Sequence, residues 1–212
     1  MTDSTQETSN AATTPLYPTQ QHYVLIPRPQ DLKSIHTERL ILRPLRIDND
    51  EDAAGIFRTR SRQDVVDWLQ SPLPDSTPED TKTWMRGKIF AAPDGQGGVA
   101  ERHFFFAMLL NDDERTVIGV MGVNSLDPAP SVGYAVHPDV WGKGYASEAA
   151  RAVVAAWWGL PRMEIQGVEE EKLYASLHCA NAGSLKVLKR AGFEVYGIKD
   201  VGHRIAFLSM GR

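Results

Sequence analysis

The sequence predicts an α+β domain with a central mixed, mostly antiparallel sheet. Apolar strand patterns come in consecutive pairs with short polar turns between them, at 102–110 with 115–123 and at 193–199 with 203–210. Such pairs are typical of antiparallel hairpins. Helical patterns are fewer and lie between the runs of strands, which favours α+β over a strictly alternating fold.

The remaining elements follow from capping and turn residues. Proline just inside a helix and Ser, Thr, Asp or Asn just before it are typical N-terminal signals. These signals and the apolar patterns predict strands at 38–46, 132–136 and 172–178, and helices from Asp48 or Asn49 to about residue 60, at 64–70, from Thr77 to about residue 90, at 146–158 and at 181–191. A glycine-rich loop is expected at 92–100.

The N-terminal region is expected to divide into a tail and an arm. Residues 1–22 are rich in Thr, Ser, Gln and Asn, and such a segment buries too little apolar surface to offset its ordering entropy. We therefore expect a disordered polar tail. Residues 23–37 contain Pro27 and Pro29, which favour a packed arm over a strand ladder. Residues 23–212 are expected to form a single domain.

Composition excludes several classes of function. The 212 residues carry a formal net charge of −4 at a sequence pI of about 5.9, without a basic block, so we expect no nucleic-acid partner. No apolar run is long enough to cross a membrane, and no secretory signal is visible. The single cysteine, Cys179, excludes an intramolecular disulfide and a cysteine-based zinc site. We expect no metal and a cytoplasmic location.

The most informative stretch, 132–148, reads as a strand, a glycine-punctuated turn and a helix. Small residues in such a turn let a ligand approach the backbone closely. The free N–H groups of the helical first turn then favour a phosphate or pyrophosphate. The expected turn comprises Gly142, Lys143, Gly144, Tyr145, Ala146 and Ser147. Its glycine spacing fits neither the dinucleotide-binding fingerprint nor the P-loop.

Two motifs carry a resemblance to a known family. The run from Trp141 to Ala149 (WGKGYASEA) resembles motif A of the GNAT superfamily of acyl-CoA-dependent N-acetyltransferases, with Trp141 where Gln or Arg is usual. In this feature it is similar to the RimJ/RimL branch, which acetylates protein N-termini and assorted small amines. Residues 181–193 resemble the superfamily's Asn-x-x-Ser/Ala…Gly-Phe motif.

The resemblance implies a GNAT fold with helices on both faces of a sheet that splays at an acyl-CoA site. It also implies a function as an acetyl-CoA-dependent N-acetyltransferase. Its acceptor would be a small-molecule amine or a peptide N-terminus, and the protein a monomer or homodimer. The turn would hold the pyrophosphate, and Asn181 the pantetheine. The resemblance also places the backbone groups of Tyr134, Ala135 and Val136 at the cofactor. It places Trp141 and Ser184 there as well, and Trp68 at the acceptor.

The catalytic groups stay open at this stage. Many relatives carry a tyrosine, seven residues after the asparagine, that protonates the leaving thiolate, but this position is Leu188 here. Ser184 is the substitute candidate. Among the histidine candidates for a base, His178, which ends the strand leading to Asn181, is favoured over His137. Because water relays are common in the superfamily, we expect that no single side chain acts as the base. A non-catalytic acyl-CoA-binding module is the alternative function.

Overall fold

The computed structural model describes residues 17–18, 23–69, 73–163 and 171–212. Of the expected tail, only Tyr17 and Pro18 belong to these residues. The ring of Tyr17 lies 5.5 Å from that of Tyr174 and 6.0 Å from that of Phe207, measured between centroids. In the arm, Val24 and Ile26 are buried, and the N–H of Leu25 donates to the carbonyl of Pro161 at 2.8 Å.

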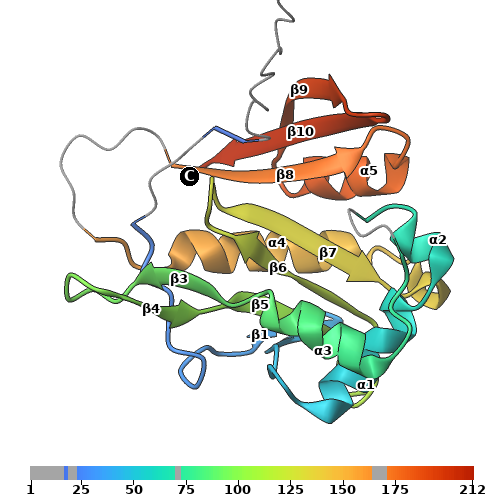
Figure 1. Ribbon diagram of the computed structural model, residues 1–212, viewed down its shortest axis with the longest axis horizontal. Helices are drawn as coiled ribbons and strands as arrows, with labels where there is room; N and C mark the ends of the chain where they lie inside the picture. Colours follow the sequence, from blue (N-terminus) through green and yellow to red (C-terminus); the bar gives the residue numbers. More distant parts are fainter. Residues whose placement is uncertain (1–16, 19–22, 70–72, 164–170) are drawn as a thin grey trace, which may run out of the picture.

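An eight-stranded sheet forms the centre of the molecule, in the order β1-β2-β5-β6-β7-β8-β10-β9 (Figure 1). Its strands, in chain order, are β1 (Ile35–His36), β2 (Leu40–Pro44), β5 (Phe104–Leu110), β6 (Gly119–Ser125), β7 (Ser131–Val136), β8 (Lys172–His178), β9 (Glu194–Asp200) and β10 (Arg204–Gly211). Neighbours are antiparallel except β7 and β8, which are parallel. The predicted mixed, mostly antiparallel sheet is confirmed.

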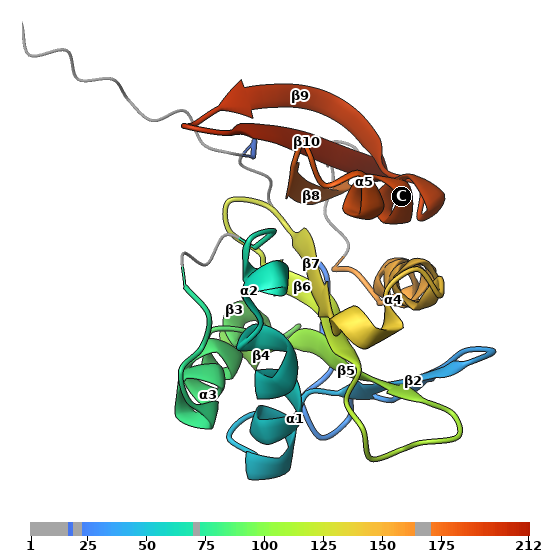
Figure 2. The same ribbon diagram turned by 90° about the vertical axis from the view of Figure 1, so that its right-hand side faces the viewer.

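Helices cover both faces of the sheet, as predicted (Figure 2). The chain forms α1 (Asp50–Arg60), α2 (Gln63–Val66), α3 (Pro78–Arg86), the 3-10 helix η1 (Pro138–Val140), α4 (Tyr145–Gly159) and α5 (Ala182–Arg190). Because successive side chains of β5 point to opposite faces of the sheet, they contribute to two separate parts of the core. Phe104, Phe106 and Met108 pack on the side of α4, whereas Phe105, Ala107 and Leu109 pack on the side of α1 and α3.

Local signals place several helix starts correctly. Asn49 caps α1 by accepting the N–H of Asp52 at 3.0 Å. Thr77 and Asp80 form a capping box at the start of α3, with Pro78 in the first turn. The expected helix from Thr77 to residue 90 is too long, because Gly87 caps α3 after Arg86.

The expected loop at 92–100 was wrong in part. Strands β3 (Phe90–Pro93) and β4 (Val99–Arg102) pair there as a separate two-stranded hairpin. The glycines occupy only its turn, where Gly95 and Gly97 have φ values of +82° and +93°. The glycine-rich composition thus predicted the turn correctly, but it gave no indication of the short strands on either side. The strand expected at 115–123 begins only at Gly119. The helix expected at 64–70 is shorter than predicted, because α2 ends at Val66; Gln70 lies outside the described residues.

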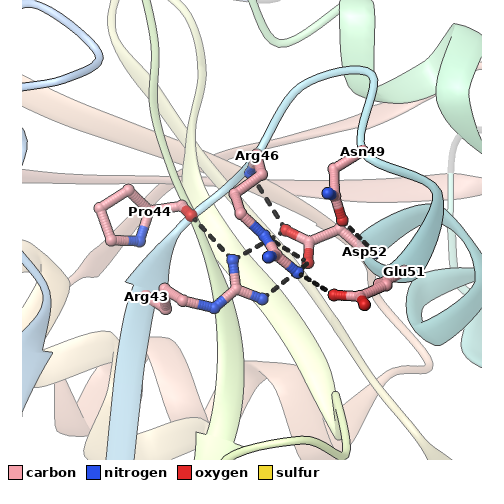
Figure 3. A network of polar contacts seen from close by, with 6 residues as sticks. All are labelled: Arg43, Pro44, Arg46, Asn49, Glu51 and Asp52. Atoms are coloured by element: carbon pink, nitrogen blue, oxygen red, sulfur yellow. Dashed lines mark hydrogen bonds and ion pairs between the residues drawn. The ribbon is translucent and has the colours of Figure 1, made fainter.

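A buried carboxylate fastens α1 to the end of β2 (Figure 3). Asp52 is 1% exposed. It accepts hydrogen bonds from the guanidinium of Arg43 at 2.7 and 2.9 Å, and from the Nη2 and backbone N–H of Arg46 at 2.5 and 3.1 Å. Burial opposes ionisation of Asp52, but the hydrogen bonds from Arg43 and Arg46 outweigh it, so its pKa lies below the usual value.

Candidate active site

Strands β7 and β8 separate soon after they meet. They share one register pair, Ser131 with Tyr174, where the Tyr174 N–H donates to the carbonyl of Pro130 at 2.9 Å. Every other neighbouring pair of long strands in this sheet continues over several residues. The sheet therefore splays toward the C-terminal ends of β7 and β8, as the resemblance implied.

The register of β7 decides which backbone groups face this gap. His137 donates its N–H to the carbonyl of Ile118 on the β6 side at 2.8 Å, and Ala135 is paired with Val120 of β6. Because backbone groups alternate along a strand, those of Tyr134 and Val136 point toward the gap. Ala135 was expected to offer its backbone to a ligand, but the register turns its N–H and C=O toward β6.

The turn between β7 and α4 has the geometry of an anion site. Gly144 is the N-cap of α4 with φ +85° and makes no side-chain cap, and Gly142 has φ +75°. The N–H groups of Ser147 and Glu148 close onto the carbonyl of Gly144, each at 3.1 Å. The N–H groups of Tyr145 and Ala146 precede the first intrahelical hydrogen bonds, so they can bind a ligand.

Arg39 fixes this turn through contacts with three of its neighbouring residues. Its guanidinium donates to the carbonyl of Lys143 at 3.0 Å and to the carboxylate of Glu148 at 2.7 Å, and it lies over the ring of Tyr145 at 4.7 Å. Thr37 also donates to Glu148, at 2.6 Å. The acid in the first turn of α4 is therefore used to fix the turn on β2.

Trp141 joins the turn to the strand before it. Its indole Nε1–H donates to the carbonyl of Val136 at 2.7 Å, although the side chain is 46% exposed. This bond uses the last carbonyl of β7 on the gap side. The N–H of Val136 and the N–H and C=O of Tyr134 remain the gap-facing groups of β7.

On the opposite wall, Asn181 caps α5, with its carboxamide oxygen accepting the N–H of Ser184 at 2.9 Å. The Nδ2 of Asn181 remains as a donor. The hydroxyl of Tyr134 is buried beside Ser184 and makes no hydrogen bond of ordinary geometry with any described residue. Burial raises the pKa of Tyr134 to about 12, against a smaller lowering by the Ser184 hydroxyl.

Two cavities meet at these side chains. The first, of about 490 Å³, runs along the turn and the first part of α4, and the second, of about 460 Å³, extends toward α3. Both volumes are within the usual range for small-molecule sites. Five residues line both cavities: Trp68, Leu69, Tyr134, Asn181 and Ser184. The two cavities are therefore adjacent at this junction.

The two cavities also differ in their cations. Lys186 and Arg190, one helical turn apart on α5, line the first cavity. Arg60 and Lys88 line the second.

Among the described residues, no group of three or more His, Cys, Asp or Glu side chains could hold a metal ion. The described helices include none that is both long and apolar enough to cross a membrane.

Residues 39–194 match the family model of the acetyltransferase (GNAT) domain. The chain belongs to the GNAT acetyltransferase family. A curated relative of this GNAT acetyltransferase, the uncharacterized N-acetyltransferase p20 of Bacillus licheniformis, is 26% identical over 171 residues, which are 79% of this chain and 85% of the relative.

Solved structures confirm the GNAT fold. The GNAT-family acetyltransferase from Bacillus anthracis matches with a TM-score of 0.62 at 20% identity, over 84% of this chain and 98% of that one. The ribosomal L7/L12 alpha-N-protein acetyltransferase RimL, solved in complex with coenzyme A, matches with a TM-score of 0.60 at 15% identity, over the same shares. At these identities the similarity establishes the fold alone.

Most residues expected at the site line one of the cavities of this GNAT acetyltransferase. The expected members of the first cavity are Tyr134, Val136, Trp141, Gly142, Gly144, Tyr145, Ala146, Ser147, Asn181 and Ser184. Trp68, expected at the acceptor, lines both cavities, and Ala135 lines only the second. Lys143 lines neither cavity, because its side chain is exposed and its carbonyl faces Arg39.

His178 is placed differently from the other candidates. Its Nδ1 accepts the N–H of Ala180 at 3.2 Å, its ring stacks on His203 at 5.1 Å, and its edge contacts Trp68 at 5.9 Å between centroids. It lines neither of the two cavities. Leu188, which stands where many relatives have a tyrosine, is 2% exposed and belongs to the core.

Sequence reasoning missed several functional positions. It considered only the backbone of Tyr134, whereas the phenol lies at the junction beside Ser184. It assigned no part to Arg39 or Lys88, which reach the site only through tertiary contacts. The spacing of Lys186 and Arg190 on one helical face was a usable signal, because residues four apart point the same way.

Proposed function

We propose that this protein is an acetyl-CoA-dependent N-acetyltransferase that moves an acetyl group directly to a primary amine within a ternary complex. One observation carries the proposal. Tyr134, Asn181 and Ser184 stand where a cavity at the N-terminus of α4 meets a second cavity on the other side of the splayed strands. Two substrates held on either side of this junction gain much of their rate from proximity and orientation.

Acetyl-CoA would bind along the first cavity. The N–H groups of Tyr145 and Ala146 would receive the pyrophosphate, and Lys186 and Arg190 supply positive charge for the phosphates. The Nδ2 of Asn181 and the gap-facing backbone of Tyr134 and Val136 would hold the pantetheine arm. Family membership and the coenzyme A bound to RimL support this placement.

In the reaction, the amine nitrogen would attack the thioester carbonyl, a C–N bond would form and the C–S bond would break. A gap-facing N–H of β7 is suited to stabilise the developing oxyanion. The hydroxyl of Tyr134 or of Ser184 would give a proton to the leaving thiolate. Because burial keeps the pKa of Tyr134 at about 12, its phenol holds its proton throughout the working pH range. Since His178 lines neither cavity, we assign the amine proton to water and retain His178 only as a candidate acting through water.

The acceptor would be a peptide N-terminus or a small amine, in keeping with the RimJ/RimL-like motif and the name of RimL. A non-catalytic acyl-CoA-binding module is the second candidate, because Leu188 has no proton to give and is buried in the core. The cytoplasmic location and the monomeric or homodimeric state remain predictions from the sequence.

A pair of glycine variants tests the cofactor site. Gly144 (φ +85°) lines the first cavity, whereas Gly97 (φ +93°) lies in the β3–β4 turn, where an added Cβ would meet nothing within 4 Å. Valine strains the backbone at both positions, but only Gly144→Val obstructs the anion turn. We expect calorimetry to show lost acetyl-CoA binding in folded Gly144→Val and unchanged binding in Gly97→Val. Equal affinity in the two variants would refute the assignment.

Turnover decides between the enzyme and the binding module. CoA release, measured with a thiol reagent, is expected with at least one member of a panel of amines and short peptides. Acetyl-CoA binding without CoA release from any acceptor, while hydrolysis controls stay at background, would favour the binding module.

A further inference from the structure

The ammonium of Lys88 occupies an aromatic part of the second cavity. Its Nζ lies 4.5 Å from the ring centre of Trp84 and 5.2 Å from that of Phe105. It donates to the Oδ1 of Asn124 at 2.8 Å. Burial lowers the pKa of Lys88 to about 8, and the charge of Arg60 adds to the effect. A charge that is partly removed from water is costly unless an opposite charge compensates it.

The described residues supply little negative charge to compensate the Lys88 ammonium. Arg60, the other cation of the cavity, is tied to Asp75 by two hydrogen bonds of 2.7 and 2.8 Å. Lys88 forms no ion pair with any carboxylate of the described residues. Among the described residues that line the cavity, the single acid is Asp127, which is exposed to solvent and therefore well screened. Within the described part of the chain, the ammonium of Lys88 is thus the one cation of this cavity without an ion-pair partner.

Asn124 holds the ammonium in this place. Its side chain lies across Gly133 of β7, where an added Cβ would come within 1.9 Å of Nδ2. Gly133 precedes Tyr134, whose phenol is at the junction of the cavities. The glycine therefore creates the space that lets Asn124 orient Lys88 on the acceptor side of the strand next to the reaction centre.

We propose that the second cavity selects an amine that also carries a carboxylate, and that Lys88 binds this carboxylate. The inference rests on the proposed function and narrows its acceptor to free amino acids with an apolar side chain. A single ammonium balances one negative charge, which favours a carboxylate over a phosphate dianion. The aromatic walls formed by Trp84 and Phe105 suit an apolar side chain.

Matched acceptors test the proposal. Phenylalanine and phenethylamine, and leucine and isopentylamine, differ within each pair only by the carboxylate, and O-phosphoethanolamine represents a phosphate. We expect the wild-type protein to prefer the amino acid in at least one pair. Lys88→Met should raise its KM for that amino acid roughly tenfold to a hundredfold, the usual effect of losing a charged hydrogen bond. The KM values for the decarboxylated amine and for acetyl-CoA should stay unchanged.

Two further variants complete the design. Lys88→Arg keeps the positive charge and should retain most of the preference. Lys189→Met removes an exposed lysine of α5 that lines neither of these cavities, and should leave every KM unchanged. The proposal is overturned if no pair shows a carboxylate preference, if only O-phosphoethanolamine depends on Lys88, or if Lys88→Met lowers kcat equally for both members of a pair, as loss of a general base would.

A binding measurement separates this proposal from the proposed reaction. N-acetylphenylalanine and N-acetylphenethylamine need no turnover, and calorimetry in the presence of CoA measures their binding directly. If no amine is acetylated but the acid still binds in a manner that depends on Lys88, the reaction fails and the carboxylate site stands. If amines are acetylated but neither the acid nor any amino acid depends on Lys88, the carboxylate site fails alone.

Discussion

Arg39 and Glu148 form an ion pair with 2.7 Å between Nη2 and Oε2, although they are 109 residues apart in the chain. The pair connects the start of β2 to the first turn of α4, and the same guanidinium binds the carbonyl of Lys143. Burial alone would raise the pKa of Glu148, but hydrogen bonds from Thr37 and Arg39 lower it below the usual value. Glu148 therefore stays ionised, held by Thr37 and Arg39, and does not line the first cavity.

We expect Arg39→Ala to weaken acetyl-CoA binding without unfolding the protein. The guanidinium is 43% exposed, so its loss should change thermal stability little. The turn, however, would lose the group that fixes the Lys143 carbonyl and Glu148, and a misplaced binding group costs up to about a hundredfold. Steady-state kinetics should show a KM for acetyl-CoA raised by about tenfold or more. Arg28→Ala, which removes an exposed ion pair with Asp31 on the N-terminal arm, is the control; the same KM in both variants would contradict the role of Arg39.

Removing the two hydroxyls at the junction should identify the proton donor. A positioned acid contributes about 10² to 10⁴ to a rate, so we expect Tyr134→Phe or Ser184→Ala to lower kcat roughly tenfold to a thousandfold, with little change in the KM for acetyl-CoA. Tyr196→Phe, on exposed β9, should leave kcat unchanged. If both hydroxyls can be removed with full kcat while chemistry limits the rate, the thiolate leaves unassisted or takes its proton from water.

Two variants of Asn181 separate capping from ligand contact. Asn181→Ala removes both the cap of α5 and the Nδ2 donor, so it should lose about 1 kcal/mol of stability and raise the KM for acetyl-CoA. Asn181→Asp retains an oxygen for the Ser184 N–H but has no amide donor, so it should raise the KM while leaving the melting temperature close to that of the wild type. A normal KM in Asn181→Asp would show that Asn181 only caps the helix.

Acid should remove the stabilisation that Asp52 provides. Its folded-state pKa is depressed, so its contribution is fully present above the unfolded value of about 3.9 and is lost as pH falls through the lower folded pKa. Asp52→Asn should reduce the free energy of unfolding by about 3 kcal/mol at pH 7. Urea unfolding at a series of pH values should show the difference between wild type and variant narrowing below pH about 4.

Asp64 provides the matched control for Asp52. Its pKa is also lowered, by the hydrogen bond from Arg62, but its side chain is 44% exposed. An exposed ion pair adds little to stability. Asp64→Asn should therefore be nearly neutral at every pH, and a large effect there would mean that general surface charge, rather than the buried network, governs acid stability.

The sequence by itself determined the elements whose signals are local. Asn49, Thr77 and Asn181 cap helices at the residues where short-range hydrogen bonding predicts a cap. The glycines of the anion turn permit positive φ angles, and both Gly142 and Gly144 adopt them. Alternating patterns and short runs of apolar residues predicted most of the strands. Two motifs predicted the family and the residues of the turn that line the first cavity.

Only the tertiary structure decided what lies opposite these elements. The register of β7 directs the backbone N–H and C=O of Ala135 toward β6 and those of Tyr134 toward the gap. A shift of one residue would exchange the two directions. Arg39 reaches Glu148, and Lys88 reaches Asn124, across 109 and 36 residues. Such pairings leave no periodic trace in the chain, because they depend on which strands become neighbours rather than on local spacing. The chemistry of the acceptor cavity is therefore set by packing, whereas the anion turn is set by sequence.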